Sequence, residues 1–342
     1  MNQPNPDYLT QAWSQASQLF PEANFLQSPS WGKMNSLIGH KVLVEHNIIA
    51  EDGKPSEAPR FWCQMIIKDA KRGRYLEIPG GPLLDWHDEA AKQTVFAKIR
   101  AIAQRERCVF VRIRPQLRSA QAELLAGLNL RKAPMHLHAE HTIILDLTKS
   151  EDELLADLRR QTRYEVRRAN KLGLQVDWSN DEAMFKEFQR VQADTAARQG
   201  FIPPDLNTLL AERQAFGDQA RLYVARTDTA EPIAYGLILI DGTEAAYFEA
   251  ASTALNQRLP GAYALEWQVI KDLKALGITR YNLWGIAPPN QPDHRYAGVT
   301  TFKKGFGGEV IEYVSAHDLV IDKVRYQLNL LVETARKKRR HL

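Results

Sequence analysis

The 342-residue sequence contains only two cysteines and no long hydrophobic run. Cys63 and Cys108 lie in separate strand-like segments without the spacing of metal ligands, so buried free thiols are expected rather than a disulfide or a zinc site. No apolar run reaches the roughly 18 residues that a membrane-spanning helix needs. The first residues lack the basic start and apolar centre of a signal peptide, which predicts a soluble, cytoplasmic protein.

The motifs of several common enzyme classes are also absent. Gly80-Gly81 stands between two prolines, which is typical of a turn, and no phosphate loop of the Walker or Rossmann kind occurs. No Gly-x-Ser-x-Gly nucleophile elbow occurs either. His136, His138 and His141 straddle an expected strand start with the third on the opposite face, so no metal site is expected. Nucleotide hydrolysis and serine-hydrolase chemistry are therefore disfavoured.

The sequence does contain enough apolar residues for two cores. Hydrophobic residues make up 44% of the 342, which predicts two domains of ordinary size. Strand-like and helix-like segments alternate, which is typical of an α/β protein. The expected strands of the second half are 141–147, 220–227, 232–241, 244–251 and 280–283. Its expected helices are 151–172, 181–200, 206–216 and 262–276, and the two halves share a similar element order, as an internal duplication would produce.

The net charge is only +4, but positive charge is concentrated on the expected helix 151–172. Ser150 and Glu153 form a capping box that begins this helix. On a helical wheel one half is cationic and the other apolar; the cations are Arg159, Arg160, Arg163, Arg167, Arg168 and Lys171. One interpretation is a solvated face, and the other is an anion site for RNA phosphates, a diphosphate or anionic lipid. Repulsion among six unpaired cations makes the second stronger than for an ordinary charged face.

The last expected helix, 322–340, has an apolar stripe that should face a core. The stripe consists of Val324, Leu328, Leu331 and Ala335. The helix ends in the basic run Arg336-Lys337-Lys338-Arg339-Arg340. Favourable interaction with the helix dipole and a solvated chain end are sufficient to account for this run.

A passage from Leu283 to Gly308 is typical of a functional site. A short apolar strand ends in Leu283-Trp284-Gly285-Ile286, and a loop through Pro288, Pro289 and Pro292 leads to Phe302-Lys303-Lys304-Gly305-Phe306-Gly307-Gly308. A single lysine is usually an ordinary surface residue. Here the neighbouring aromatic residues and the preceding buried strand predict that Lys303 projects into a cleft. A cation there could hold a carboxylate or a phosphate, or stabilise the oxyanion of an acyl transfer between two aligned substrates.

Three passages carry a resemblance to a known family. They are Arg159-Arg160-Gln161-Thr162-Arg163-Tyr164-Glu165-Val166-Arg167-Arg168-Ala169, Tyr247-Phe248-Glu249-Ala250-Ala251-Ser252, and Tyr281-Asn282-Leu283-Trp284-Gly285-Ile286 with the Phe302-to-Gly308 passage. Weaker echoes are Gln27-Ser28-Pro29-Ser30-Trp31-Gly32-Lys33 and Gly81-Pro82-Leu83-Leu84-Asp85. Through them the chain resembles the Fem family (FemABX) of aminoacyl-tRNA-dependent, peptidoglycan bridge-forming aminoacyltransferases, most closely from about Leu145 to Leu319.

The resemblance implies an α/β fold of two tandem acetyltransferase-like (GNAT) domains with mixed central sheets flanked by helices. The first domain would comprise residues 1–145, completed by the C-terminal helix 318–342, and the second would comprise residues 146–317. No pair of long heptad helices interrupts the second half, so the chain resembles the compact members that lack a helical arm.

The resemblance also implies a reaction and a set of site residues. An amino acid would pass from aminoacyl-tRNA, a co-substrate rather than a cofactor, to an amine of a peptidoglycan precursor. Lys303 with Phe302 would be catalytic, Lys303 steadying the developing negative charge and the tRNA end. The implied substrate contacts are Trp31, Lys33, Asp85, Arg198, Tyr247, Glu249 and Trp284. The implied tRNA contacts are the six cations of 159–171 and Lys304.

The chain departs from the compact relatives where those hold a nucleotide-linked acceptor. Gly200-Phe201 replaces a glycine followed by a basic residue, which leaves Arg198 as the nearest cation. Arg114-Pro115 replaces an acidic residue before proline, and no basic residue precedes Gly81-Pro82. The sequence is therefore as compatible with a lipid-linked precursor, reached through peripheral contact with the inner membrane face, as with a UDP-linked one.

Two other functions remain open on the sequence alone. A GNAT-type N-acyltransferase would use acyl-CoA, and Gln257-Arg258-Leu259-Pro260-Gly261-Ala262 is close to the pyrophosphate-binding turn that such an enzyme needs. A non-catalytic module would bind RNA or anionic membranes through residues 159–171 and 336–340.

Overall fold

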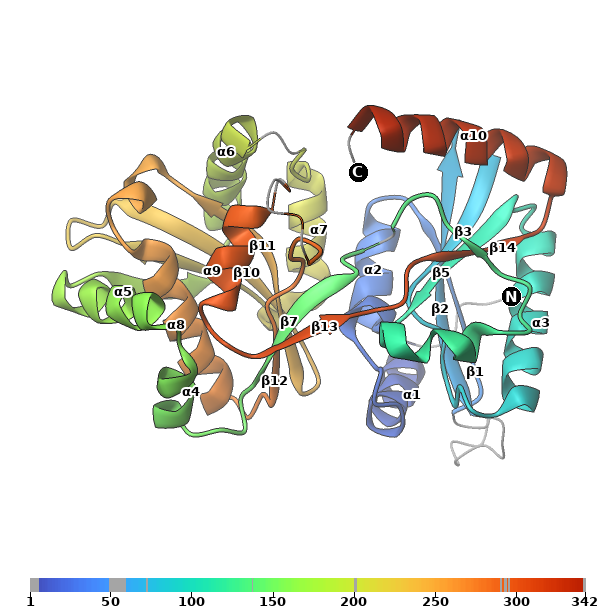
Figure 1. Cartoon of the computed structure of the whole chain (residues 1–342), viewed down its shortest axis with the longest axis horizontal. Coiled ribbons are helices and arrows are strands. Elements are labelled where there is room, and N and C mark those ends of the chain that lie inside the picture. Colours follow the sequence, from blue (N-terminus) through green and yellow to red (C-terminus); the bar gives the residue numbers. More distant parts are fainter. Residues whose placement is uncertain are drawn as a thin grey trace. The chain divides into compact units, whose positions relative to one another are not determined.

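The computed structural model describes residues 7–48, 60–71, 73–136, 138–198, 202–289, 291, 294 and 296–334, and the backbone of 6, 199 and 335–340. The chain forms two compact units, Met1–Glu140 with Glu312–Leu342, and His141–Ile311. Each unit has a central sheet with helices against it (Figure 1). Strand β7 (His141–Asp146) belongs to the second unit and residues 312–317 to the first, a few residues from the boundaries expected at 145 and 317.

The first unit is built on a sheet in the order β1-β2-β3-β5-β14-β6, with β4 paired to β2. Its strands are β1 (Lys41–His46), β2 (Phe61–Ala70), β3 (Gly73–Gly80), β4 (Leu83–Leu84), β5 (Phe110–Pro115), β6 (Arg131–Lys132) and β14 (His317–Val320). Its helices are α1 (Pro6–Leu19), η1 (Phe25–Gln27), α2 (Pro29–Leu37), α3 (Glu89–Arg105), η2 (Ser119–Leu125) and α10 (Lys323–Arg340). Strands β3 and β5 pair in parallel and the other pairs are antiparallel. Cys63 and Cys108 are buried and free, as predicted.

Helix α10 packs through a different face from the one that the sequence predicted. Arg112 of β5 binds Asp318 of β14 through two hydrogen bonds of 2.8 and 2.9 Å, and it also binds Glu333 of α10. Tyr326, also on α10, donates to Asp318 and is buried. This polar attachment sets the inner face of α10, so the predicted core stripe is wrong at Val324, Leu328 and Leu331, which are 77%, 61% and 66% exposed. The side chain of Ala335, the fourth member of the stripe, lies outside the described residues. The basic side chains of 336–340 lie outside the described residues.

The second unit is built on a sheet in the order β13-β7-β12-β11-β10-β9-β8. Its strands after β7 are β8 (Gln175–Ser179), β9 (Ala220–Arg226), β10 (Pro232–Asp241), β11 (Glu244–Ser252), β12 (Arg280–Asn282) and β13 (Glu309–Glu312). Its helices are α4 (Glu151–Asp157), α5 (Arg160–Lys171), α6 (Glu182–Gln199), α7 (Leu206–Phe216), η3 (Gly217–Gln219), η4 (Ala254–Gln257), α8 (Gly261–Ala275) and α9 (Ala297–Lys304). No helix of the described residues is long and apolar enough to cross a membrane.

The expected helix 151–172 is two helices. Its predicted capping box is present, since the backbone N–H of Ser150 donates to Glu153 and the N–H of Glu153 donates to the Ser150 hydroxyl. The chain then becomes extended at Leu158 and Arg159, between α4 and α5. Leu158 is buried in the core, and the N–H of Arg159 donates to the carbonyl of Gly305 at 2.9 Å. These tertiary contacts break the helix because they replace the hydrogen bonds of one turn.

The parallel pair β11 and β12 separates partway along its length. The two strands pair only from Glu244 to Ala246 and from Arg280 to Asn282, although β11 continues to Ser252. The edge of β11 beyond Ala246 is therefore not covered by β12. Such a separation at the carboxyl end of strands is where α/β folds place ligands.

Candidate active site

A cleft of about 670 Å³ lies along the uncovered edge of β11. One wall is β11 from Tyr247 to Ser252, and the opposite wall comes from the start of α8 and from α9. The lining residues are Thr195, Ala234, Tyr247, Phe248, Glu249, Ala250, Ala251, Ser252, Asn256, Ala262, Tyr263, Gly298, Val299, Phe302 and Lys303. The cleft thus joins two of the three passages that the sequence singled out.

Lys303 occupies the last turn of α9 and reaches the cleft from a buried position. It is only 7% exposed, and its Nζ donates to the carbonyl oxygen of Gly285 at 2.8 Å. The same nitrogen lies 5.7 Å from the centre of the Tyr247 ring. Burial lowers the pKa of Lys303 from 10.5 to about 8, although nearby Glu266 opposes this shift. The side chain is therefore a cation at neutral pH, and the Gly285 carbonyl holds its position.

The carbonyl that receives Lys303 is positioned by a strained turn after β12. Trp284 has φ of +61°, in the left-handed region that non-glycine residues rarely adopt. Its N–H donates to Asn282 Oδ1 at 3.0 Å, and its carbonyl accepts a hydrogen bond from Thr142 Oγ1 at 3.1 Å. The turn is thus held at both ends, which directs the next carbonyl, that of Gly285, towards Lys303.

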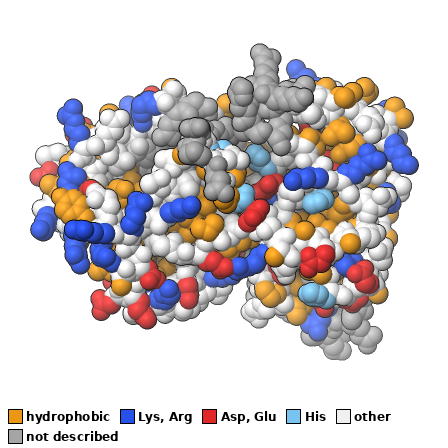
Figure 2. Space-filling view, viewed as in Figure 1, with side chains coloured by type: hydrophobic (Ala, Val, Ile, Leu, Met, Phe, Trp, Pro, Cys, Tyr) orange, Lys and Arg blue, Asp and Glu red, His pale blue; other side chains and the backbone are white. Residues whose placement is uncertain are grey.

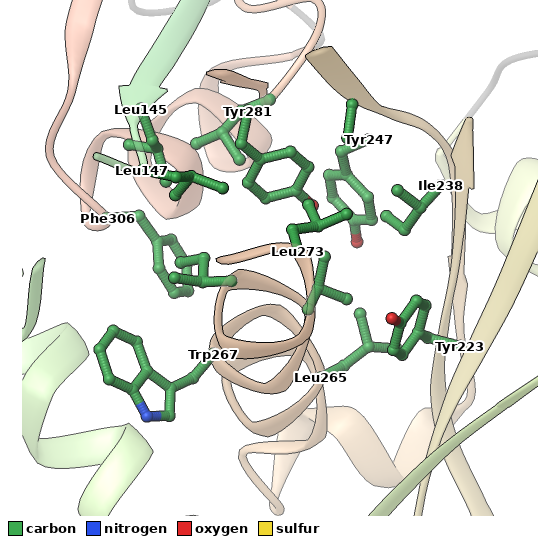
Figure 3. Packing of buried hydrophobic residues seen from close by; sticks show 14 of the residues in the cluster. Leu145, Leu147, Tyr223, Ile238, Tyr247, Leu265, Trp267, Leu273, Tyr281 and Phe306 are labelled. Carbon is green, nitrogen blue, oxygen red and sulfur yellow. The ribbon is translucent and has the colours of Figure 1, made fainter. Parts of the chain in front are cut away.

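A buried carboxyl group lies behind Lys303. Glu266 of α8 is 0% exposed, and neither carboxyl oxygen has a hydrogen-bond partner of good geometry among the described residues. Burial raises its pKa to about 7, opposed by the Tyr281 hydroxyl and by Lys303. In Figure 3 the rings of Tyr247 and Tyr281 lie next to each other beside α8. Glu266 is therefore largely protonated below pH 7, which leaves the Lys303 cation available to a ligand.

Aromatic side chains form the apolar part of the cleft wall. The Phe302 ring is 5.1 Å from the Tyr263 ring and 5.2 Å from the Phe306 ring, both in edge-to-face arrangements. Phe306 is 2% exposed, whereas Phe302 and Tyr263 are half-buried and line the cleft. The buried ring anchors the other two, so α9 presents Phe302 and Lys303 on a rigid base.

Helix α5 begins directly against α9. The Arg159 guanidinium donates to the carbonyl of Thr301 at 3.3 Å, in addition to the backbone contact with Gly305. A side chain at Gly305 would collide with the hydroxyl of buried Thr162 on α5. Glycine is required there because the two helices approach so closely. The cationic helix and the Lys303 helix therefore form one continuous surface.

The cations of α5 divide into two groups. Arg163 donates to the carbonyls of Leu155 and Ala156, and Arg168 binds Glu165 and the carbonyl of Arg258. The second group is exposed and has no ion pair within the described residues; it comprises Arg160, Arg167 and Lys171, and Lys304 of α9 is exposed in the same way. Figure 2 shows the resulting concentration of Lys and Arg side chains over α5.

Four of the predicted substrate residues lie in or beside the cleft. Tyr247 and Glu249 line it, and Trp284 packs edge-to-face on Phe248, which also lines it, at 5.7 Å. Arg198 at the end of α6 donates to the carbonyl of Ser252 at 2.5 Å. The structure therefore brings them together with Lys303 and Phe302.

The other three predicted substrate residues lie in the first unit and do not line this cleft. Trp31 is buried and packs against Phe25 at 5.5 Å, so it contributes to the core of that unit. Lys33 is exposed on α2. Asp85 is exposed and lines a separate cavity of about 390 Å³, where it accepts a hydrogen bond from the N–H of His87.

Sequence reasoning missed Glu266, Gln192 and Glu212. Glu266 interrupts the apolar run Ala264-Leu265-Glu266-Trp267 of α8, and an acidic residue in such a run was the signal that could have identified it. Gln192 of α6 contacts Glu249 of β11 only in three dimensions, and Glu212 of α7 interacts with Glu249 electrostatically. No sequence spacing indicates that contact.

The sequence of this chain matches a known protein family. The model of the FemAB family matches residues 10–136, 125–232 and 228–334. Aminoacyltransferase FemA of Staphylococcus epidermidis is 32% identical over 122 residues, which are 34% of this chain and 29% of that protein. The matched segment thus spans less than a third of that relative's length.

Two solved structures share the fold over nearly the whole chain. The crystal structure of FemX has a TM-score of 0.81 at 18% identity, with 96% of this chain and 98% of FemX covered. A tandem GNAT protein from the clavulanic acid biosynthesis pathway has a TM-score of 0.55 at 11% identity, with 93% and 96% covered. The expected fold of two tandem acetyltransferase-like units is therefore confirmed, and the chain belongs to the FemAB family.

Proposed function

We propose that this protein is an aminoacyltransferase that moves an amino acid from aminoacyl-tRNA to an amine on the stem peptide of a peptidoglycan precursor, the step that forms an interpeptide bridge. The observation that supports it most is the buried Lys303 cation on the wall of an open cleft. Its hydrogen-bond partner there is the backbone carbonyl of Gly285, and among the described residues it forms no ion pair with a carboxylate.

The chemistry needs a cation where negative charge develops. The neutral acceptor amine attacks the ester carbonyl carbon, and the electron pair of the C=O bond moves to the oxygen. Lys303 stabilises that oxyanion through its charge and its N–H donors. Collapse of the intermediate breaks the bond to the ribose oxygen of tRNA, which takes up a proton as the amine loses one. The half-buried Phe302 and Tyr263 offer surfaces on which the terminal base can stack.

The cationic face of α5 supports tRNA as the donor carrier. Arg160, Arg167 and Lys171 are exposed and α5 packs on α9, so phosphates bound along α5 lead towards Lys303. Lys304 extends the same positive surface.

The identity of the acceptor is tested by offering two of them. Purified protein is incubated with aminoacyl-tRNA and either a UDP-linked or a lipid-linked muropeptide. We expect the mass of one amino acid to be added to the stem peptide of at least one acceptor. Salt-sensitive tRNA binding with no product from either acceptor would contradict the proposed transferase and favour a non-catalytic RNA-binding module.

The start of α8 disfavours the acyl-CoA alternative. The N–H of Ala262 donates to Asn256 Oδ1 at 2.9 Å, and the N–H of Gly261 donates to the carbonyl of Leu259. Two of the donors that would receive a pyrophosphate are therefore already used within the chain. CoA is expected to leave the melting temperature unchanged, and a shift of several degrees at millimolar CoA would favour the alternative.

Peripheral contact with the inner face of the membrane belongs to the same proposal. Val324, Leu328 and Leu331 form an exposed apolar stripe on α10, and Lys323 and Arg325 lie on the same helix. Figure 2 shows hydrophobic side chains gathered along α10 with cations nearby. Exposed apolar side chains beside positive charge are what a helix needs to lie on an anionic bilayer. Such contact would place the enzyme near a lipid-linked acceptor.

A further inference from the structure

Three hydrogen-bonding side chains meet on the α6 side of β11. Gln192 of α6 is 0% exposed, and its Nε2 donates to Glu249 Oε2 of β11 at 2.6 Å. Glu212 of α7 is 2% exposed and acts electrostatically on Glu249. The two carboxyl groups and the amide therefore form one cluster, here called the carboxyl–amide cluster.

A β-bulge places the carboxyl–amide cluster on the opposite face of β11 from Tyr247, and Glu249 is the member of the cluster that lines the cleft. Glu249 pairs with Leu237 and Tyr247 pairs with Ile238, with the register shift between them. Neighbouring residues of β10 face opposite sides of the sheet, so their partners on β11 do as well. Tyr247 faces Lys303, and Glu249 faces α6 while still lining the cleft. A ligand in the cleft can therefore reach both.

The carboxyl–amide cluster contains more hydrogen-bond acceptors than donors. Gln192 Oε1 and Glu212 Oε2 are buried without a hydrogen-bond partner in the part of the chain that the structure describes. No lysine or arginine of that part forms an ion pair with Glu212 or Glu249. Burial raises the pKa of Glu249 to about 7 and that of Glu212 well above its usual value. The charged forms of these two acids are costly without a cation, and the cost falls if a ligand brings the cation.

We propose that Glu249, Glu212 and Gln192 form a binding site for a primary ammonium group. The inference rests on the proposed function, because both substrates of that reaction carry a primary amine: the α-amino group of the aminoacyl ester and the attacking amine of the acceptor. An ammonium has three N–H donors and no acceptor, which complements Gln192 Oε1, Glu212 Oε2 and the Glu249 carboxylate. The site would orient that amine relative to the oxyanion position at Lys303. An acceptor amine held there would pass one proton to the Glu249 carboxylate and then attack as the neutral amine.

Binding is tested without turnover by ligand-observed NMR titration of the full chain. The donor-like probe is alanine amide, and the acceptor-like probe is Nα-acetyl-lysine amide; each is compared with its form acetylated on the free amine. We expect at least one ammonium probe to bind and its acetylated form to bind at least about tenfold more weakly, since hydrogen bonds to charged groups are worth about 1.5 to 3 kcal/mol. The probe that binds identifies the source of the amine.

Substitutions then test whether the ammonium probe binds at the carboxyl–amide cluster. Glu249→Gln and Glu212→Gln keep side-chain size and should each weaken the ammonium probe about tenfold or more. Asp194→Asn removes a charge from an exposed position of α6 and should leave binding unchanged. Melting curves verify folding, and the Glu212→Gln protein should be at least as stable as the wild type because it buries no acid.

Two results would overturn the site: equal binding of an ammonium probe and its acetylated form, or wild-type affinity in both Gln variants. Ammonium binding lost in these variants, in a protein that transfers no amino acid, would retain the site and refute only the proposed function.

Discussion

Burial of Lys303 beside the Gly285 carbonyl has opposite effects on stability and on function. Desolvation lowers its pKa to about 8, so keeping the charged form in the folded chain at neutral pH lowers the free energy of unfolding. We expect Lys303→Met to raise the free energy of unfolding at pH 7 by about 1 to 3 kcal/mol, since each pKa unit corresponds to about 1.4 kcal/mol. Urea unfolding measures this, and a clear loss of stability would show that Lys303 is structural.

The stability contribution of Lys303 also has a defined pH dependence. Between about pH 8 and pH 10.5 the unfolded chain still binds a proton at this side chain, whereas the folded chain has released it. Stability of the wild type relative to Lys303→Met should therefore rise with pH across that window. A constant difference between the two proteins from pH 7 to 10.5 would mean that the pKa of Lys303 is not lowered in the folded state.

The transfer rate should fall as Lys303 loses its proton. If the ammonium form stabilises the oxyanion, kcat decreases above about pH 8. Lys303→Arg, whose side chain stays charged, should be slower at pH 7 because its planar group fits the site poorly, yet should lack this decrease. A wild-type decrease that persists unchanged in the arginine variant would assign the titration to another group.

At the residue scale the sequence predicted Lys303, Phe302, Tyr247 and Glu249 because each lies in a recognisable passage. It missed Glu266, Gln192 and Glu212 because they have no such passage. Their role comes from burial against residues distant in the chain, and burial is a tertiary property.

At the element scale, α5 differs from the helix that its sequence pattern predicts. Helical periodicity runs on from α4, and only the buried Leu158 and the Arg159 contact with Gly305 interrupt it. A local pattern cannot report such a contact, because the partner is 146 positions away in the sequence (305 minus 159). The break matters for function, since it allows α5 to begin on α9.

The exposed cations of α5 should contribute to tRNA affinity as phosphate contacts. Replacing both Arg160 and Arg167 by Gln should weaken tRNA binding at low salt and lower the slope of log K against log salt concentration by roughly 1.4 to 1.8, or about 0.7 to 0.9 per contact. The double variant Lys71→Gln with Lys98→Gln removes two exposed cations from the first unit and is the control. Equal slopes in the two double variants would exclude α5 as the tRNA contact.

At the scale of the whole molecule, alternating elements were enough to predict two α/β units, and the family passages predicted their type. The orientation of α10 could not be predicted, because its sequence has an apolar stripe and a polar one. The buried pair of Arg112 and Asp318 selects the face with Tyr326 and Glu333. A charged pair from β5 and β14 thus overrides the hydrophobic periodicity of the helix.

The outward stripe of α10 gives a testable membrane contact. The double variant Leu328→Gln with Leu331→Gln should lose co-sedimentation with phosphatidylglycerol vesicles, because it removes apolar area that inserts between headgroups. Binding to phosphatidylcholine vesicles should be weak throughout. Leu37→Gln with Leu276→Gln changes two other exposed leucines and should leave sedimentation unchanged. Equal sedimentation of all three proteins would contradict this role of α10.

The most direct test of the proposed activity is single-turnover transfer from aminoacyl-tRNA to a muropeptide acceptor, with the wild type and Lys303→Ala compared at pH 7. Removing one oxyanion-stabilising group typically costs on the order of 10² to 10³ in rate, and we expect a loss of that size. Lys186→Ala, which alters an exposed lysine of α6 in the same unit, should retain the wild-type rate. A full rate in Lys303→Ala would contradict the role assigned to Lys303.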